Sequence, residues 1–487
     1  MQLQQLLSYL PIYQMIGEGN PDITSIEQNH KQVSKGSLFI CIKGEKFDGH
    51  LFAEEAIKNG AVAIISEKDL HLSVPVIVVN DSKRVMAIVA SAFYNHPSHH
   101  LMVIGVTGTN GKTSTSHYIN SMLQYAGKKT GLIGTMYTKI NHEVFETKNT
   151  TPDSLTLQKT FHEMLVKQVD TAIMEVSSHA LHQGRVWGTD FNIAVFTNLT
   201  QDHLDYHKTM DEYKRAKSLL FSQLGNTYND FSGKFAVLNS DEEASELFAQ
   251  STAAHVISYG IHGNADIRAT NIEVNGNGSS FDLVTPSGTI SIQTKLIGLF
   301  NIYNLLAAAS VGWIMKLSLK EIREAFSTLE GVPGRFELVD EKQPFPVIVD
   351  YAHTPDGLEN VLNTVRELAN RRVFVVIGCG GDRDKSKRPK MAEIACRLAT
   401  DAIFTSDNPR SEDPEQIIED MLKGIKGNNY KVILDRKEAI KYAIMEANDG
   451  DVVLIAGKGH ETYQIIGDQV LPFDDRKIAA DVIKERL

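Results

Sequence analysis

Short apolar runs alternate with helical patterns over the first hundred residues. The apolar runs predict three strands, at 36–43, 61–65 and 76–79. A helical pattern predicts one helix, at 53–59. Gly60 follows that helix, and glycine often ends a helix at this position. Such alternation indicates a small α/β layer, so we expect a first domain at 1–98. Proline and serine at 96–100 predict a linker there. Its three histidines suggest metal binding less well than a solvated segment, because no cysteine or carboxylate is spaced around them.

The next part of the chain places polar residues directly after apolar strands. Strands are predicted at 101–104, 171–176 and 193–197, and helices at 115–123 and 301–317. A β-rich stretch with Asn-Gly turn signals lies between them, at 250–295. Ligands of open α/β sheets bind at the carboxyl ends of strands. We therefore expect a central domain at 99–332 that carries a binding site at this sheet edge.

The last part of the chain predicts a third domain at 333–487. Four apolar strands each end in a loop rich in glycine or charge, at 347–349, 373–377, 402–405 and 452–455. This arrangement is typical of a doubly wound sheet whose functional loops share one edge. The glycines at 378, 380 and 381 do not fit the dinucleotide pattern G-x-G-x-x-G.

The stretch 105–115, Gly-Val-Thr-Gly-Thr-Asn-Gly-Lys-Thr-Ser-Thr, is the strongest chemical signal. It lies between a strand and a helix, as a phosphate-binding loop does. Glycines let the backbone approach a phosphate, and the N–H groups of the first helical turn point at the anion. Lys112 supplies a positive charge, and the Thr113 hydroxyl suits a Mg²⁺ ion. The strict pattern G-x-x-x-x-G-K-[ST] is missed because its first position is Val106. A plain glycine-rich turn is the weaker alternative.

Composition narrows the class of protein. The chain of 487 residues has 42% hydrophobic and 22% charged residues, which is ordinary for a globular protein. A net charge of −11 argues against a nucleic-acid binder. Three distant cysteines fit a reducing compartment, and neither a signal peptide nor a membrane-spanning run is evident. We therefore expect a cytoplasmic protein with no nucleic-acid partner and no membrane insertion. A monomer is a separate expectation, because composition does not determine the oligomeric state.

Several polar residues follow the predicted strands. Glu175 and His203 could hold Mg²⁺ or a water molecule near a triphosphate, or could be simple loop anchors. By spacing alone, Lys217 is an exposed helix lysine. The loop 407–410 ends in Arg410, a side chain suited to gripping a carboxylate, although a plain surface loop is the alternative. With Arg383 and Glu461 from neighbouring loops, Arg410 could hold a zwitterion.

The loop at 105–113 resembles the ATP loop of the Mur ligases and the folylpolyglutamate synthases. Further stretches resemble the Mur ligases in family order along nearly the whole chain, at 149–152, 174–185, 197–205, 213–217, 298–304, 331–335, 350–355, 407–410 and 457–461. The resemblance implies an α/β protein of three domains: a small α/β domain for the UDP-linked substrate, a central P-loop-type ATPase domain with a parallel sheet, and a Rossmann-like domain for the amino acid.

The resemblance also implies roles for individual residues. ATP would be bound by Thr107, Gly108, Thr109, Asn110, Gly111, Lys112, Thr113, Asn301 and Arg335. Catalysis would involve Lys112, Lys217, His203 and Asp350. One Mg²⁺ would be held by Thr113 and Glu175, and a second by His203 and Lys217, the last as a carbamate. UDP-MurNAc-L-Ala-D-Glu would be held by Asn149, Thr150, Thr151, Ser177, Gln183 and Arg185. The amino acid would be held by Arg383, Asp407, Asn408, Pro409, Arg410, Gly457 and Glu461.

Within the family, Asp-Asn-Pro-Arg marks the branch that adds meso-diaminopimelate to the D-Glu carboxylate through an acyl-phosphate, in peptidoglycan synthesis. Addition of L-lysine, folylpolyglutamate synthesis and a nucleotide-regulated binding protein without catalysis are the alternatives. The sequence departs from the family at 29–31, where Asn-His-Lys replaces the usual Asp-Ser-Arg. No contact with the uridine nucleotide is therefore predicted for His30.

Overall fold

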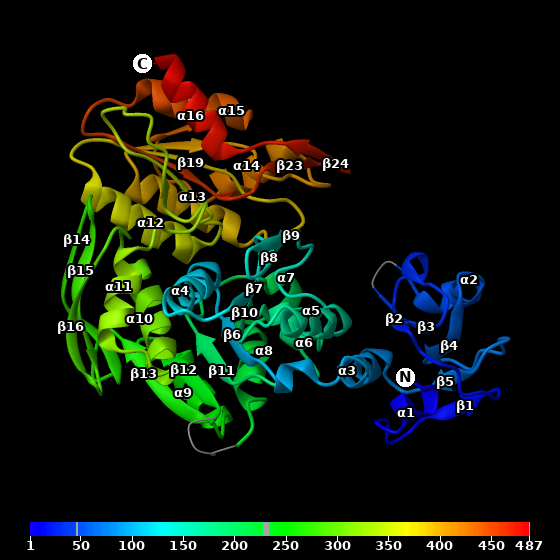
Figure 1. The fold of residues 1–487 in the computed structure, drawn as a ribbon. Helices are drawn as coiled ribbons and strands as arrows, with labels where there is room; N and C mark the ends of the chain where they lie inside the picture. The colour runs from blue at the N-terminus through cyan, green and yellow to red at the C-terminus, as the bar shows by residue number, and fades with distance from the viewer. Residues whose placement is uncertain (45–46, 227–232, 487) are drawn as a thin grey trace. The chain divides into compact units, whose positions relative to one another are not determined.

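The computed structural model describes residues 1–44, 47–226 and 233–486. It divides the chain into two compact units. The first unit comprises 1–105, 128–193 and 226–234, and the second comprises 106–127, 194–225 and 235–487. Figure 1 draws the elements of both units along the chain. The domain boundaries expected from the sequence stay predictions.

The N-terminal part of the first unit is built on a five-stranded sheet of order β1-β5-β4-β3-β2. Its elements are α1 (Leu3–Leu7), β1 (Gln14–Ile16), β2 (Ser25–Glu27), β3 (Ser37–Ile40), α2 (Ala53–Lys58), β4 (Ala61–Ser66), β5 (Val76–Val78) and α3 (Ser82–Phe93). Strands β2 to β5 are parallel, and β1 is antiparallel to β5. Apolar clusters lie on both sheet faces. The predicted strands and helix are confirmed, and Gly60 has a positive φ of 114° after α2.

The stretch 96–100 is not a solvated linker throughout. A short 3-10 helix, η3, covers Pro97–His99, and Pro97 and Ser98 are buried. The Ser98 hydroxyl accepts a hydrogen bond from the backbone N–H of Asp190 at 3.0 Å. The expectation of a solvated segment is therefore wrong for these two residues, because a segment near Asp190, far away in the sequence, packs against them.

The remainder of the first unit is a sheet of order β6-β10-β7-β8-β9. Its elements are β6 (Met102–Thr107), which continues into the second unit, β7 (Thr130–Ile133), β8 (Thr138–Ile140), β9 (Glu143–Phe145), α5 (Ser154–Val166), β10 (Thr171–Glu175) and α6 (Ser178–His182). Strand β10 is parallel to β7, and β7, β8 and β9 are antiparallel to one another in turn. Strand β10 is buried along its whole length and ends at Glu175.

In the second unit the strand order runs β16-β15-β14-β13-β12-β11 and then the end of β6. The strands are β11 (Ile193–Phe196), β12 (Phe235–Asn239), β13 (His255–Gly260), β14 (Ile267–Asn275), β15 (Gly278–Thr285) and β16 (Gly288–Thr294). The helices are α4 (Lys112–Tyr125), α7 (Leu204–His207), α8 (Met210–Ser222), α9 (Ala244–Ser251), α10 (Leu299–Ile314) and α11 (Leu319–Ser327). The antiparallel ladder β14-β15-β16 confirms the predicted β-rich stretch.

The C-terminal part of the second unit is a six-stranded sheet of order β17-β18-β22-β19-β20-β21. The strands are β17 (Glu337–Leu338), β18 (Val347–Asp350), β19 (Val373–Ile377), β20 (Asp401–Phe404), β21 (Tyr430–Val432) and β22 (Val452–Ala456), with the hairpin β23 (Tyr463–Ile466) and β24 (Gln469–Pro472) outside the sheet. The neighbouring strands β18, β22, β19, β20 and β21 are parallel to one another. The predicted sheet with its strand-end loops on one edge is therefore confirmed.

Helices cover both faces of this sheet (Figure 1). One face packs against α12 (Pro355–Leu368), α13 (Lys387–Leu398) and α14 (Pro414–Leu422), and the other against α15 (Arg436–Glu446) and α16 (Asp475–Arg486). Burial on both faces explains why the central strands are continuous apolar runs rather than alternating ones. None of the helices within the described ranges is long and apolar enough to cross a membrane.

Candidate active site

The loop after β6 has the backbone that its glycines predict. Gly108 and Gly111 have φ angles of 153° and 83°, in the region that side chains disfavour. A Cβ at Gly108 would collide with the Thr197 hydroxyl, and one at Gly111 would lie 2.5 Å from Asn304 Oδ1. Gly111 is the N-cap of α4, so the loop leads directly into the N-terminus of a helix, which carries a partial positive charge. The loop is therefore built to receive an anion.

Lys112 and Thr113 begin helix α4 beside this loop. The Lys112 ammonium donates hydrogen bonds to the carbonyls of Gly108 and Thr109, at 2.9 and 2.8 Å. The buried Thr113 hydroxyl accepts a hydrogen bond from Arg335 Nη2 at 3.1 Å. A cation and a guanidinium thus flank the loop, where phosphate oxygens would carry negative charge.

Lys217 is buried, with 1% of its surface exposed, so the prediction of an exposed lysine from spacing is wrong. Its Nζ donates to the Gly108 carbonyl at 2.6 Å and lies 4.5 Å from the ring centroid of Tyr213. Burial, and then the charge of Lys112, hold the pKa of Lys217 well below its usual range. The missed signal was helical periodicity, because Tyr213, Lys217 and Leu220 share the buried face of α8.

His203 lies at the N-cap of α7 with a positive φ of 56°. Its Nε2 is 3.4 Å from the Asp202 carboxylate. Lys387 Nζ and His353 Nε2 also approach Asp202, at 3.5 and 3.7 Å. Burial alone would raise the pKa of Asp202, but Lys387 and His353 hold it well below its usual range. Sequence reasoning selected His203 and missed Asp202, whose neighbours Lys387 and His353 come from α13 and from the loop after β18.

Glu175 is fully buried at the end of β10 in the first unit. Its two carboxylate oxygens accept hydrogen bonds from the N–H and the hydroxyl of Thr135, each at 2.9 Å. An added Cβ at Gly134 would lie within contact of the same carboxylate, which is therefore closely enclosed. A buried anion of this kind suits a hard cation.

A second group of predicted residues meets in the first unit. The Thr151 hydroxyl donates to the Glu175 carbonyl at 2.8 Å and accepts from the Ser177 N–H at 3.0 Å. Arg185 donates to Gln183 Oε1 at 2.6 Å and to the Thr151 carbonyl at 3.3 Å. The predicted residues Asn149 and Thr150 precede them, and the Thr150 hydroxyl lies 3.1 Å from that of Thr135. Hydrogen bonds thus connect Thr151, Ser177, Gln183 and Arg185 in the first unit.

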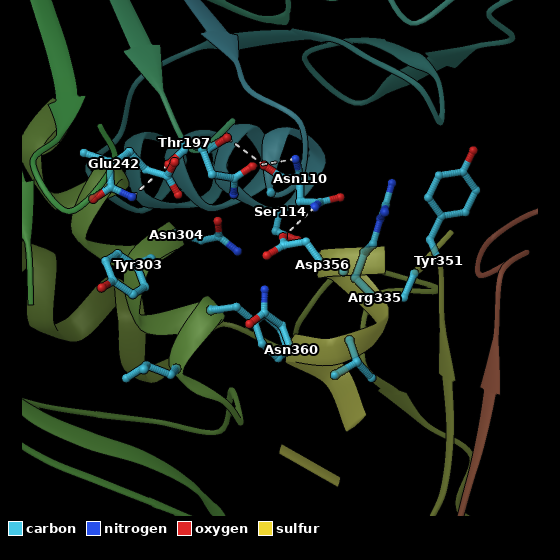
Figure 2. A pocket seen from close by; sticks show the side chains of 18 of the residues that line it. Asn110, Ser114, Thr197, Glu242, Tyr303, Asn304, Arg335, Tyr351, Asp356 and Asn360 are labelled. Carbon is cyan, nitrogen blue, oxygen red and sulfur yellow. Dashed lines mark hydrogen bonds between the residues drawn. The ribbon is translucent and has the colours of Figure 1, made fainter. Parts of the chain in front are cut away.

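A cavity of about 290 Å³ opens beside the glycine loop in the second unit. Figure 2 shows side chains from the loop, from α10 and from the start of α12 pointing into it. Four predicted residues line the cavity, namely Asn110, Gly111, Arg335 and Asp350. Sequence reasoning missed most of the polar lining, which includes Ser114, Asn239, Asp241, Glu242, Tyr303, Asn304, Asp356 and Asn360. The cavity joins strand ends and helices that are far apart in the sequence.

Asn301 does not line this cavity. Its Oδ1 accepts from the Tyr118 hydroxyl and its Nδ2 donates to the Ile297 carbonyl, both at 2.9 Å. Asn304, one turn further along α10, faces the cavity instead (Figure 2). The motif at 298–304 had pointed to this helix, but the side-chain direction within it required the structure.

The cavity is acidic on one side. Asn110 Nδ2 donates to the Thr354 hydroxyl and the Asp356 carboxylate, at 3.2 and 3.0 Å. Asp350 accepts from two backbone N–H groups, and burial raises the pKa of its carboxyl. Burial also raises the pKa of Glu242 to about 7. The pocket therefore offers hydrogen-bond acceptors away from the phosphate loop.

The predicted amino-acid residues meet at the strand-end edge of the C-terminal sheet. Asn408 Nδ2 donates to Glu461 Oε2 at 2.9 Å. A Cβ at Gly457, whose φ is 113°, would lie 2.9 Å from Asp407 Oδ2, so only glycine lets these loops approach. Buried Pro409 fixes the turn between Asn408 and Arg410. The structure thus brings the loops at 407–410 and 457–461 together.

Among the described residues, neither Arg383 nor Arg410 forms an ion pair with a carboxylate, and the hydrogen bonds of both guanidinium groups go to backbone carbonyls. Arg410 Nη1 donates to the Gly381 carbonyl at 2.7 Å, and Arg383 Nη1 donates to the Asp382 carbonyl at 2.8 Å. Burial, and then the nearby charge of Arg383, lower the pKa of Arg410. Two guanidinium groups at one edge of the sheet could together receive a carboxylate of a ligand.

Comparisons with known proteins agree with this geometry. Three family models match the chain: the Mur ligase family catalytic domain at 22–98, the Mur ligase middle domain at 106–312 and the Mur ligase glutamate ligase domain at 334–459. The UDP-N-acetylmuramoyl-L-alanyl-D-glutamate--2,6-diaminopimelate ligase of Bacillus velezensis is 58% identical over 486 residues, covering 100% of this chain and 99% of that protein. The ligase of the same name from Listeria monocytogenes is 55% identical over 488 residues, with coverage of 100% and 99%.

Solved structures are similar over the same length. A UDP-N-acetylmuramoyl-L-alanyl-D-glutamate--2,6-diaminopimelate ligase structure has a TM-score of 0.71 at 34% identity, covering 100% of this chain and 99% of that one. The MurF ligase from Thermotoga maritima, in complex with ADP, has a TM-score of 0.67 at 18% identity, with coverage of 95% and 96%. The latter likeness concerns the fold alone. Family models along the chain and relatives above half identity over its full length establish that this protein belongs to the Mur ligase family.

Proposed function

We propose that this protein is the ATP-dependent ligase that joins meso-2,6-diaminopimelate to the D-Glu carboxylate of UDP-MurNAc-L-Ala-D-Glu, in peptidoglycan synthesis. The observation that carries the proposal is 58% identity over the full length to a relative with that printed activity. The site described above supports it, because a glycine loop for phosphate and a pair of arginines suited to the carboxylates of an amino acid lie in one unit.

The chemistry must overcome repulsion between anions. A carboxylate oxygen of D-Glu attacks the γ-phosphorus of ATP, the bond to the β-phosphate oxygen breaks, and ADP leaves with that electron pair. The product is an acyl-phosphate. Lys112 and the N–H groups of the loop neutralise charge on the transferring phosphoryl group. Arg335, which already donates to Thr113, adds a second cation on the same side.

The second step makes the amide bond. The amine nitrogen of diaminopimelate, after losing its proton, attacks the acyl carbon, and inorganic phosphate leaves. Water would compete by hydrolysing the acyl-phosphate. Asn110 already links the loop to Thr354 and Asp356 of the C-terminal part, so these contacts help to exclude water from the phosphate end of the cavity.

The residues that the family resemblance assigns to Mg²⁺ have suitable chemistry. Thr113 and His203 of the second unit offer a hydroxyl and an imidazole, and Glu175 of the first unit offers a buried carboxylate. Each is a group that divalent cations accept as a ligand. When bound, Mg²⁺ would neutralise charge on the triphosphate. Mg²⁺ prefers oxygen ligands, and the amine of Lys217 does not offer one. Its low pKa makes the neutral amine available to react with CO₂, and the resulting carbamate would supply the missing anion.

The amino-acid site suits a ligand with two charged ends. Diaminopimelate carries two ammonium and two carboxylate groups. Arg383 and Arg410 provide a guanidinium group for each of its two carboxylates, and Glu461 provides an acid for an ammonium. L-Lysine lacks the second carboxylate and would leave a guanidinium unpaired. This difference supports diaminopimelate over the L-lysine alternative.

Phosphate release by the purified protein tests the proposal. We expect release from ATP only when UDP-MurNAc-L-Ala-D-Glu and meso-diaminopimelate are both present, and a product with the mass of the tripeptide. Replacement of diaminopimelate by L-lysine, or of both substrates by a folate and glutamate, should give little release. Release with the folate pair instead would establish a folylpolyglutamate synthase, and no release with any pair would favour a binding protein.

We further propose that the enzyme acts as a monomer in the cytoplasm with Mg²⁺ and ATP as cofactors. Buried and unpaired Cys41 and Cys379 support a reducing compartment. Light scattering of the purified chain and fractionation of cells that express it test the two statements. A dimeric mass, or recovery with the membrane fraction, would contradict them.

A further inference from the structure

Lys458 is a fully buried lysine in the turn between β22 and β23, with 0% of its surface exposed. Its Nζ lies 3.0 Å from Asn408 Oδ1 and 3.1 Å from Glu461 Oε2. Burying an ammonium group is costly unless it is paired and hydrogen-bonded. The pairing here is with two residues of the amino-acid site, while Lys458 itself has no surface from which to reach a ligand.

Lys458, Asn408 and Glu461 form a closed set of contacts, which we term the Lys458 triangle. Asn408 Nδ2 donates to Glu461 Oε2 at 2.9 Å, which completes the third side. Asn408 Oδ1 also accepts from the Ile465 N–H at 2.9 Å, so both its lone pairs are used. An ammonium and a backbone N–H can only donate, so Lys458 and Ile465 together dictate that the amide oxygen of Asn408 faces inward.

The triangle leaves part of Glu461 available. Oε2 accepts from both Lys458 and Asn408, whereas Oε1 has no hydrogen-bond partner among the described residues. The backbone N–H of Glu461 donates to the Lys458 carbonyl at 3.0 Å, which closes the turn and fixes the start of the side chain. One oxygen is therefore anchored inside while the other can accept from an ammonium group.

We propose that Lys458 is a positioning residue for the incoming amino acid. It fixes the Asn408 amide and the Glu461 carboxylate in the orientation that receives meso-diaminopimelate, without contacting that substrate. The proposal rests on the proposed function. Its physical basis is pre-organisation: a site whose polar groups are already oriented binds its ligand with less loss of entropy.

Replacement of Lys458 by methionine and by glutamine tests the proposal. Lys458→Met keeps an unbranched side chain but removes every donor, whereas Lys458→Gln keeps an amide N–H for Asn408 Oδ1. We expect the KM for meso-diaminopimelate to rise about 10- to 100-fold in Lys458→Met and less in Lys458→Gln, because a hydrogen bond to a charged group is lost. The KM for ATP and kcat should stay within about twofold of wild type.

Lys441→Met is the matched control, since Lys441 is a partly exposed lysine of the same sheet domain that pairs with Glu485 at 3.2 Å. It should leave all constants unchanged. A fall in kcat with an unchanged KM for diaminopimelate, or an equal rise in the KM for ATP, would overturn the positioning role. Loss of the cooperative melting transition in both Lys458 variants would do the same, because the role would then be structural. Wild-type protein that does not use diaminopimelate would instead refute the proposed function.

Discussion

Arg410→Ala should selectively weaken the use of meso-diaminopimelate. Arg410 has a positive φ of 54°, and its backbone N–H and carbonyl are held by Ile465 and Gly467 of the β23–β24 hairpin. The hairpin contacts do not depend on the side chain, so alanine should remove the guanidinium and leave the loop in place. Burial, and then the nearby charge of Arg383, lower the pKa of Arg410.

The magnitude follows from the bonds that a carboxylate would lose. In this structure Arg410 Nη1 is held by the Gly381 carbonyl, so the guanidinium is already oriented and little ordering entropy offsets its contact with a ligand. A hydrogen bond to a charged group contributes about 1.5–3 kcal/mol, which corresponds to about 10- to 100-fold in affinity. We therefore expect the KM for meso-diaminopimelate to rise by about this factor.

Coupled phosphate-release kinetics measure the effect, with diaminopimelate varied at saturating ATP and then ATP varied at saturating diaminopimelate. The KM for ATP should not change. Arg397→Ala is the control, because Arg397 is a half-exposed arginine of α13 that pairs with Glu359 at 2.7 Å. An unchanged KM for diaminopimelate in Arg410→Ala would remove Arg410 from the amino-acid site.

Three further predictions concern the loop, the buried lysine and the acidic cavity wall. Lys112→Ala should lower turnover with ATP at least about 100-fold, because a cation at the transferring phosphate is lost; near-normal phosphate release would refute the loop assignment. Lys217→Arg cannot form a carbamate and should be inactive, and wild-type protein in ¹³C-bicarbonate should show a carbamate NMR signal that this variant lacks; equal spectra would contradict the modification. Glu242→Gln should gain free energy of unfolding relative to wild type as the pH rises. The pKa of Glu242 is raised from 4.5 to about 7 in the folded state, so its contribution is full below about pH 4.5 and is lost as the pH passes about 7. Urea denaturation at pH 5 and pH 8 measures the difference, and a constant gap between the two proteins would show that Glu242 is not buried in this way.

Local patterns were sufficient to predict the fold class and the position of the phosphate loop. The strands at 373–377 and 452–455 are apolar along their length because helices cover both faces of their sheet, and that composition is visible without any tertiary information. The loop at 105–115 carries its own evidence, since glycine at 108 and 111 is required by the backbone angles of those two residues. Both features are set by residues that lie close together in the chain, so they can be predicted from the sequence.

Side-chain surroundings were not predictable in the same way. Lys217 occupies the buried face of α8, yet a lysine in a helix is far more often exposed, so spacing alone gave the wrong environment. Asn304 rather than Asn301 faces the cavity, and a difference of one helical turn is beyond what a motif specifies. Lys458 lay within a recognised motif, but its contacts with Asn408 come from a loop on another strand.

By itself, the sequence determined the alternation of strands and helices, the glycine loop and the family to which the chain belongs, because each depends on residues close together in the chain or in a fixed order along it. Which polar groups meet depends on how the chain folds in space. Asp202 is paired with Lys387 across 185 positions, and Asn110 with Asp356 across 246. Such contacts are made by strand ends that the sheet brings to one edge, and no local pattern records the distance between them.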